Sequence, residues 1–150
     1  MDNSIQSLEL SSAIEKHENE KAKRLIDDVG TDLVGYGGTA LNFAAFYNNL
    51  EIAKYAIEKG ADVNHSFASS KGKGFTPLMA ACEKGNVEMV KLLIHNGADV
   101  NASDSHGRTA LDILVFEIRD NEEEILKVLL NAGVDPKRFQ IFLKNRLMIF

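Results

Sequence analysis

FTPLMAACEKGNVEMVKLLIHNGADVN, residues 75 to 101, contains the start and stop signals of a pair of short helices. Thr76 can accept a hydrogen bond from a free backbone N–H at the start of the first helix, and Pro77 suits the first helical position. The small residues Ala81 and Cys82 let a neighbouring helix approach closely. Gly97 ends the second helix, because glycine adopts the left-handed conformation without a steric penalty. The segment therefore predicts a helix–turn–helix unit whose apolar face a single unit cannot bury alone.

The same unit recurs on both sides of this segment. GTALNFAAFYNNLEIAKYAIEKGADVN occupies residues 38–64, and RTALDILVFEIRDNEEEILKVLLNAGVD occupies residues 108–135. Thr76 and Thr109 are 33 residues apart, whereas Thr39 and Thr76 are 37 residues apart. The four additional residues fall in the connecting loop before Thr76, where an insertion has a small entropic cost.

Two weaker segments flank these repeats. LSSAIEKHENEKAKRLIDDVGTDLV, residues 10–34, has helical patterning, and Ser12 with Glu15 predicts a capping box at the start of its first helix. After the last repeat, Pro136 at a first helical position predicts a closing helix over residues 136–149. Apolar residues at helical spacing are expected to place this helix over the last repeat: Phe139, Phe142, Leu143, Leu147 and Phe150.

The segments resemble ankyrin repeats, above all in GADVN followed by TPL and in the 33-residue period. The resemblance implies an all-α solenoid of about four helix-turn-helix repeats with β-hairpin-like fingers and a C-terminal capping helix. We expect one domain over residues 1–150, with repeats at about 5–34, 35–71, 72–104 and 105–135, the first one degenerate. The usual His of the family after TPL is replaced by Asn42, Met79 and Asp112, which leaves open whether its hydrogen bond to the neighbouring loop is kept.

Composition and charge narrow the class of partner. The 150 residues have a formal net charge of −5 and a pI near 5.4, whereas a nucleic-acid backbone or an anionic membrane calls for clustered Lys and Arg. We therefore expect a protein partner, basic in character, and neither nucleic acid nor a membrane. A single cysteine, Cys82, cannot form an intrachain disulfide, and the first residues lack the pattern of a secretory signal. The expected location is cytoplasmic.

Glycine-rich segments suggest nucleotide binding, but their context argues against it. GYGGTA, residues 35–40, fits G-x-G-x-x-A, yet the following helix leads to the turn EKGADVNH instead of a second strand ending in an acidic residue. KGKGFT, residues 71–76, lacks the spacing of a phosphate-binding loop. The four histidines show no metal-ligand spacing, and no nucleophile is paired with a base. We predict no cofactor, no metal and no catalytic residue.

The resemblance implies a concave binding surface formed by the fingertips and the exposed side of each first helix. We expect Phe46, Tyr47 and Phe116 to be exposed there, because they follow the paired small residues, and exposed aromatic residues are typical of interface hot spots. Phe67 and Phe75 on the long finger have no obvious core to enter. The complete set of predicted partner-binding residues is Tyr36, Phe46, Tyr47, His65, Phe67, Lys71, Lys73, Phe75, Glu83, Lys84, Asp104, His106, Arg108, Asp112, Phe116 and Glu117.

The sequence predicts a non-enzymatic protein-binding module that is monomeric on its own. Acidic residues beside the aromatic ones, at Glu83, Asp112, Glu117 and 120–124, favour an inhibitor of a basic protein, such as an immunity-type protein that neutralises a toxin or enzyme. One alternative is a general adaptor or scaffold ankyrin protein with several partners. The other is a nucleotide-binding protein or small enzyme that uses the glycine-rich loops.

Overall fold

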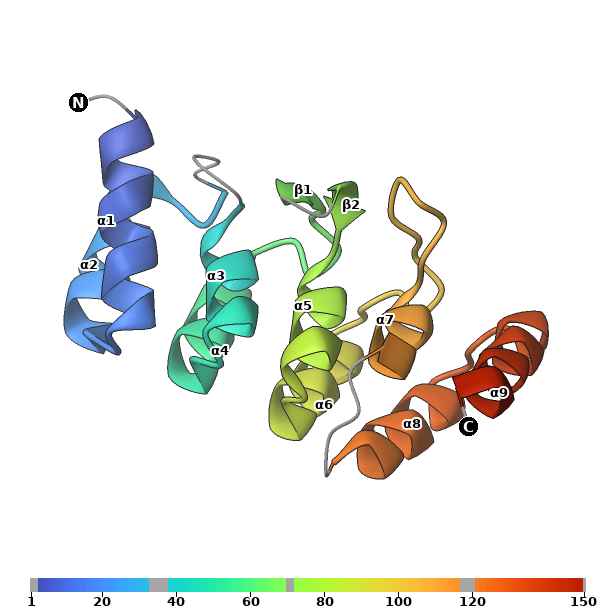
Figure 1. Ribbon diagram of the computed structural model, residues 1–150. Helices are drawn as coiled ribbons and strands as arrows, with labels where there is room; N and C mark the ends of the chain where they lie inside the picture. Colours follow the sequence, from blue (N-terminus) through green and yellow to red (C-terminus); the bar gives the residue numbers. More distant parts are fainter. Residues whose placement is uncertain (1–2, 33–37, 70–71, 117–120, 150) are drawn as a thin grey trace.

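The computed structural model describes residues 3–32, 38–69, 72–116 and 121–149 (Figure 1). Within these ranges the chain forms four helix pairs, one short hairpin and a last helix. The elements are α1 (Asn3–Glu15), α2 (Asn19–Val29), α3 (Ala40–Phe46), α4 (Leu50–Glu58), β1 (Phe67–Ser69), β2 (Gly72–Phe75), α5 (Pro77–Lys84), α6 (Val87–His95), α7 (Ala110–Phe116), α8 (Glu122–Asn131) and α9 (Pro136–Ile149).

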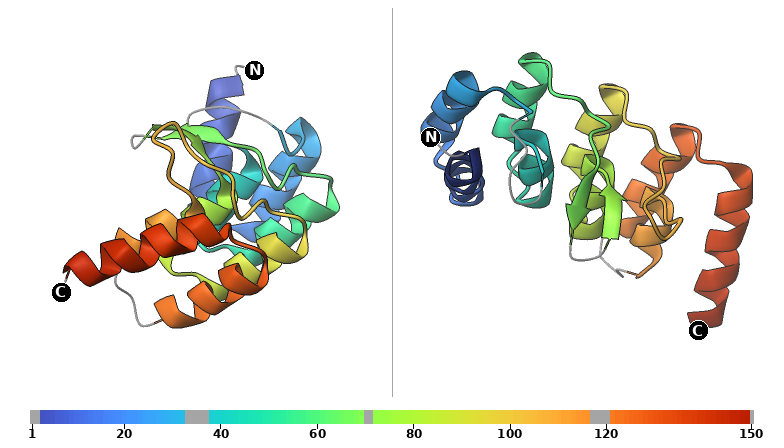
Figure 2. Two further views of the ribbon diagram at one scale, coloured as in Figure 1. Left: turned by 90° about the vertical axis from the view of Figure 1, so that its right-hand side faces the viewer. Right: turned by 90° about the horizontal axis from the view of Figure 1, so that it is seen from above.

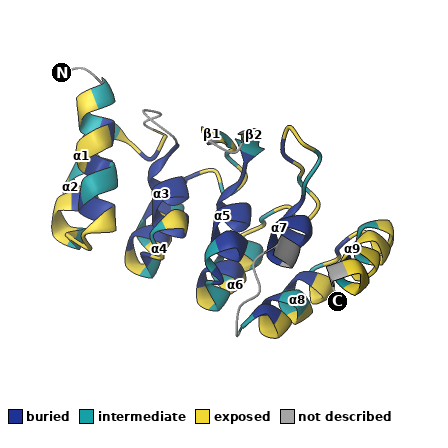
Figure 3. Cartoon of the chain, in the orientation of Figure 1, coloured by how far each residue is buried: buried dark blue, intermediate teal, exposed yellow. Residues whose placement is uncertain are grey.

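The helices form two rows. The first helices α1, α3, α5, α7 and α9 contact one another in that order, and the second helices α2, α4, α6 and α8 form a parallel row behind them. Buried residues are concentrated in α3, α5 and α7, whereas α1, α2, α8 and α9 carry many exposed ones (Figure 3). This arrangement confirms the predicted all-α solenoid of helix pairs with a closing helix. No described helix combines the length and the apolar character that a membrane span requires.

The threonine caps lie where the sequence predicts them. Thr76 Oγ1 accepts a hydrogen bond from the backbone N–H of Met79 over 3.2 Å, and Pro77 occupies the first helical position. Thr39 and Thr109 make the equivalent bond at the starts of α3 and α7, each over 3.5 Å. These bonds satisfy one of the N–H groups that a helix start leaves without a backbone partner, which fixes where each first helix begins.

The first helix begins well before the capping box that the sequence predicts. Helix α1 starts at Asn3, so Ser12 lies in its last turns and the predicted capping box of Ser12 and Glu15 is wrong. The reason is the buried face of the helix: Ser7, Leu10 and Ile14 follow one another at three- and four-residue spacing and are all enclosed. The buried face of α1 therefore begins at Ser7, ahead of the predicted cap.

Small side chains set the close approach of the central first helices. Ala44, Ala45, Ala81 and Cys82 are completely buried between neighbouring helices, as the sequence predicts. Burial raises the pKa of the Cys82 thiol to about 12, because the thiolate would lose its hydration. Cys82 therefore acts as a small apolar residue of the core.

The long finger is an antiparallel hairpin, as predicted, and it is bonded to the next finger. Phe67 pairs with Phe75 across β1 and β2. On the other edge of β2, the N–H of Ser105 donates to the carbonyl of Lys73 over 2.8 Å, and the N–H of Lys73 donates to Ser105 Oγ over 3.1 Å. The hairpin and the loop before α7 therefore lie together on one side of the stack (Figure 2).

Two asparagines connect successive repeats. Asn64 Oδ1 accepts from the N–H of Asp99 over 2.7 Å, and Asn64 Nδ2 donates to the carbonyl of Gly97 over 3.1 Å. One repeat later, Asn101 bonds Asp135 and Gly133 in the same way, over 2.8 and 3.0 Å. The asparagine that ends GADVN therefore links successive repeats, a role that the sequence pattern alone does not indicate.

Helix α9 covers α7 with one face. Phe142 is buried and Phe139 is half-buried against the core. Two ion pairs fix the helix, from Arg146 to Glu122 of α8 and from Arg138 to Asp112 of α7. Leu143 and Leu147 are expected to cover the last repeat as well, but Leu143 is 39% exposed and Leu147 is 79% exposed, so the expectation is wrong for Leu147 and Leu143 is only partly covered. Phe150 lies outside the described residues.

Candidate protein interface

An aromatic pair marks the C-terminal end of α3. Phe46 is 38% exposed, and its ring meets the ring of Tyr47 edge to face with centroids 5.1 Å apart. The ammonium of Lys84, at the end of the neighbouring α5, lies 4.2 Å from the centroid of the Phe46 ring. A cation over an aromatic face is attracted by the electrons of the ring. Phe46 therefore lies at a junction of two repeats, contacted by Tyr47 and Lys84 and partly exposed to solvent.

The other two aromatic residues of this predicted surface differ from Phe46. Tyr47 was expected to be exposed, but it is half-buried and packs against the core, because the chain turns there towards α4. Phe116 ends α7, and its side chain lies outside the described part of the structure. Tyr36, Lys71 and Glu117 are also predicted partner-binding residues that lie outside the described ranges.

The long finger contributes less apolar surface than the sequence suggests. Phe75 is 3% exposed, so the expectation that it is free to bind a partner is wrong. It leads directly into α5, where it joins the core, and its ring lies 5.7 Å from the ring of Phe67. Phe67 is half-buried. The hairpin thus covers its own aromatic residues and leaves Lys73 exposed between them.

Two carboxylates of the predicted acidic surface are enclosed. Glu83 is buried in the last turn of α5, which is flanked by α3 and α7. Asp112 is buried near the start of α7, where its Oδ2 accepts from both the N–H and the hydroxyl of Thr109, over 2.8 and 2.9 Å, and pairs with Arg138. Both residues are buried, so the expectation that they are exposed contact residues is wrong.

Asp104 organises the loop before α7 from a buried position. Its Oδ1 accepts from the N–H groups of His106 and Arg108, each over 2.9 Å, and its Oδ2 accepts from the guanidinium of Arg108 over 2.7 Å. Burial acts to raise the pKa of Asp104, but the bonds from Arg108 and His106 outweigh burial and hold the pKa below its ordinary value. Its assignment as a partner contact is therefore wrong, whereas His106 is exposed and Arg108 is half-buried.

The residue in place of the family's His keeps one bond to the neighbouring loop. Asn42 Nδ2 donates to the carbonyl of His65 over 3.0 Å, and Asn42 Oδ1 accepts from the N–H of Thr39 over 2.9 Å. His65 itself is half-buried. The short amide thus holds the base of the long finger, which answers the question that the sequence left open for the second repeat.

Charges on the second helices are paired between repeats. Lys23 of α2 contacts Glu51 of α4 over 2.6 Å, and Lys91 of α6 contacts Glu124 of α8 over 2.8 Å. The hydrogen bonds that the Lys91 ammonium donates to Glu124 and Glu88 raise its pKa, with Glu124 as the main cause. Exposed pairs of this kind contribute little stability, so they link neighbouring repeats only weakly.

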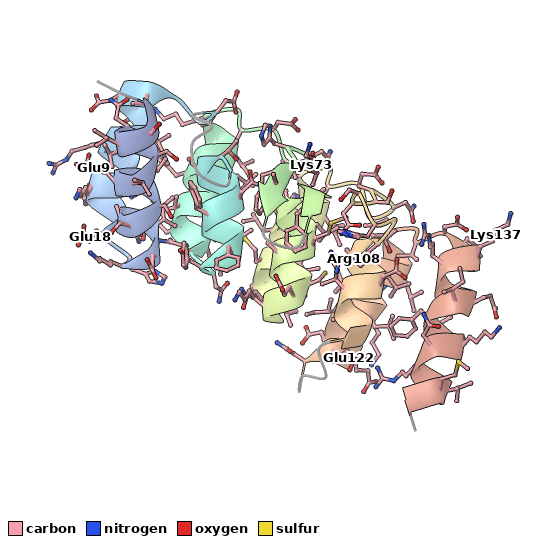
Figure 4. The ribbon with its side chains drawn as sticks, turned by 45° about the horizontal axis from the view of Figure 1, so that its top comes forward. Glu9, Glu18, Lys73, Arg108, Glu122 and Lys137 are labelled. Carbon is pink, nitrogen blue, oxygen red and sulfur yellow. The ribbon has the colours of Figure 1, made fainter. Side chains whose placement is uncertain are left out.

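Fewer of the predicted partner-binding residues are therefore accessible to a partner than the sequence predicts. On the first-helix and finger side, three of these residues are exposed and five are half-buried: Phe46, Lys73 and His106, and then Tyr47, His65, Phe67, Lys84 and Arg108. Figure 4 shows Lys73 and Arg108 on neighbouring fingers above the row of first helices. Within the described ranges, no three His, Cys, Asp or Glu side chains lie together in a way that could hold a metal ion.

Comparison with known families agrees with this arrangement. Residues 65–140 match the family model for ankyrin repeats in three copies, and residues 36–65 match the model for a single ankyrin repeat. The two matches together run from the start of the second repeat into α9. No curated protein matches the chain significantly.

Proposed function

This chain belongs to the ankyrin repeat family, whose members are generally non-enzymatic modules for protein–protein interaction, and we propose that it binds another protein through its fingers and first helices. The observation that carries the proposal is Phe46. Its ring is exposed on the first-helix side, at the junction of two repeats, and is held in place by Tyr47 and Lys84. A rigid, accessible aromatic ring loses little entropy on binding and is typical of an energetic hot spot.

The more specific proposal is inhibition of a basic partner, in the manner of an immunity protein. The net charge of −5 supports it, because a negatively charged chain attracts a basic protein at long range. The buried carboxylates Glu83 and Asp112 do not support it, since neither faces a partner. Of the other predicted acidic residues, Glu123 and Glu124 are exposed, whereas Glu117 and Asp120 lie outside the described residues, so the proposal of a basic partner rests mainly on the charge of the whole chain.

The test compares two residues of nearly equal exposure on opposite rows. Phe46→Ala removes the exposed ring on the first-helix side, and Leu130→Ala removes a side chain that is 37% exposed on α8. The wild-type chain is immobilised and used to capture partners from its native cells, and each variant is then compared for the amount of each partner retained. We expect Phe46→Ala to weaken retention more than tenfold, as the loss of a hot spot of about 2 kcal/mol would do, and Leu130→Ala to leave it unchanged.

The captured proteins also separate the alternatives. A single stoichiometric partner whose activity is lost in the complex supports the inhibitor, whereas a varied set of partners supports an adaptor. Equal retention by both variants would contradict the assignment of the surface. Heat released on titration with a nucleotide would instead support the nucleotide-binding alternative.

A further inference from the structure

The first helix of the row exposes apolar residues on an acidic face. Ile5 and Leu8 of α1 are 56% and 55% exposed and lie on the side opposite the buried face. Glu9 and Glu15 are exposed around them, and α1 contains no Lys, Arg or His. We call this surface the α1 face: Ile5, Leu8, Glu9 and Glu15.

The last helix exposes apolar residues on a basic face. Leu147 and Met148 of α9 are both 79% exposed, and Ile141 is exposed nearby. Helix α9 contains four Lys and Arg residues and no Asp or Glu, in a chain whose net charge is −5. Two of these cations, Lys137 and Lys144, are exposed and complete what we call the α9 face: Lys137, Ile141, Lys144, Leu147 and Met148.

The charged side chains of both faces have no salt-bridge partner within the described part of the chain. Among the described residues, neither the two glutamates of the α1 face nor the two lysines of the α9 face form a salt bridge with one another or with any other residue, whereas Lys23, Lys59, Lys91 and Lys127 all do. Figure 4 shows Glu9 and Lys137 at opposite ends of the row of first helices. One end therefore presents unpaired negative charge beside apolar side chains, and the other end presents unpaired positive charge beside apolar side chains.

We propose that the α1 face of one molecule packs on the α9 face of a second copy. The structure contains the type of contact that this needs, because each first helix already packs on the next one along the row. Such a contact would cover apolar residues from both molecules and bring the two sets of unpaired charges together. The α9 face alone would also suit an anionic membrane, but the acidic α1 face would not, and a second copy explains both faces at once.

The geometry of this contact predicts open-ended association. The two faces are different surfaces of the same chain, so the interface is heterologous, and each added molecule leaves one free face of each kind. One helix against another buries less area than stable interfaces do, so we expect weak association that depends on concentration. This proposal replaces the sequence-based expectation of a monomer and leaves the proposed partner surface free.

Two complementary variants test the head-to-tail contact. Ile5→Gln with Leu8→Gln removes the apolar part of the α1 face, and Leu147→Gln with Met148→Gln removes that of the α9 face, all at exposed positions. The wild type and both variants are studied by sedimentation equilibrium from low micromolar to near-millimolar concentration, with thermal unfolding to verify that each variant is folded. We expect the mass of the wild type to rise beyond that of a dimer, and each variant alone to remain a monomer.

The mixture of the two variants provides the decisive result. Because each variant keeps one intact face, an equimolar mixture should form a dimer and nothing larger. A charge reversal, Lys144→Glu, should weaken association of the wild type several-fold, whereas the matched Lys54→Glu on α4 should not. A wild-type chain that stays monomeric would overturn the proposal, and so would undiminished association of the α1 variant, which would indicate a symmetric contact between α9 helices. Binding of α9 to phosphatidylserine vesicles without self-association would also overturn it.

Discussion

Replacing Asn101 with alanine should weaken the junction between the last repeat and its neighbour. The side chain uses both of its amide atoms across the junction, as a donor to the carbonyl of Gly133 over 3.0 Å and as an acceptor from the N–H of Asp135 over 2.8 Å. Each bond contributes about 1 kcal/mol net to stability, so Asn101→Ala should lower the free energy of unfolding by about 2 kcal/mol. For a domain of this size the midpoint of thermal unfolding should fall by about 4–8 °C.

A nearby asparagine gives the matched control. Asn96 Nδ2 donates to the carbonyl of Leu92 over 2.8 Å, a single bond that stays within its own repeat. Asn96→Ala should therefore cost about 1 kcal/mol or less. Both variants are measured by urea unfolding followed through circular dichroism, with the slope of the transition compared to verify that the unfolded states are equivalent.

Hydrogen exchange locates the effect. Because repeats contact only their neighbours, loss of the link should increase amide exchange in α8 and α9 far more than in α3. The reasoning would be refuted if Asn101→Ala destabilised the chain no more than Asn96→Ala does, or if exchange increased equally in every helix.

Three further outcomes follow from the buried groups and the fingers. Cys82, whose pKa is raised to about 12 by burial, should react with a thiol reagent only after urea unfolds the chain, and rapid labelling of the folded chain would contradict its burial. The pKa of Asp104 is lower in the folded chain than in the unfolded chain, so the stabilisation that Asp104 gives the fold should be complete above pH about 4 and be lost as the pH falls further. Asp104→Ala should therefore lower the free energy of unfolding at neutral pH and make that free energy fall less steeply in acid. Urea unfolding at several pH values measures both effects. Gly74 has a φ of +83°, and a Cβ added there would lie 3.1 Å from the Cα of Asp104. Gly74→Ala should therefore lower the free energy of unfolding by more than the roughly 1–2 kcal/mol that the backbone conformation alone costs a residue with a Cβ. Gly107 has a φ of +73° and open space around it, so Gly107→Ala should show only that smaller loss.

The helix pairs could be predicted because their signals are local. Thr76 and Pro77 specify a helix start within a few residues, and the glycines of GADVN specify the ends, so neither requires knowledge of distant contacts. The period of 33 residues then gives the stacking, since one repeat cannot bury its apolar face alone.

The accessibility of single side chains could not be predicted in the same way. Phe75 is buried because β2 leads into α5 and folds against the next finger, which is a contact between segments about 30 residues apart. Asp112 is buried because it bonds Thr109 locally and Arg138 of α9. In α9, apolar residues occur on more than one side of the helix, so the pattern does not indicate that Phe142 is enclosed and Leu147 is exposed.

The two hydrogen bonds between Lys73 and Ser105 make the spacing of the helices independent of the length of the long finger. The outgoing strand β2 is bonded to the following repeat and leads directly into α5, and α3 packs on α5 as α5 packs on α7, so the longer connection leaves the stacking of the first helices unchanged. A foreign recognition loop grafted between β1 and β2 should therefore change what the molecule binds while its scaffold stays intact. Natural variation in this one connection would have the same freedom, which makes it a place where a new specificity can arise at small structural cost.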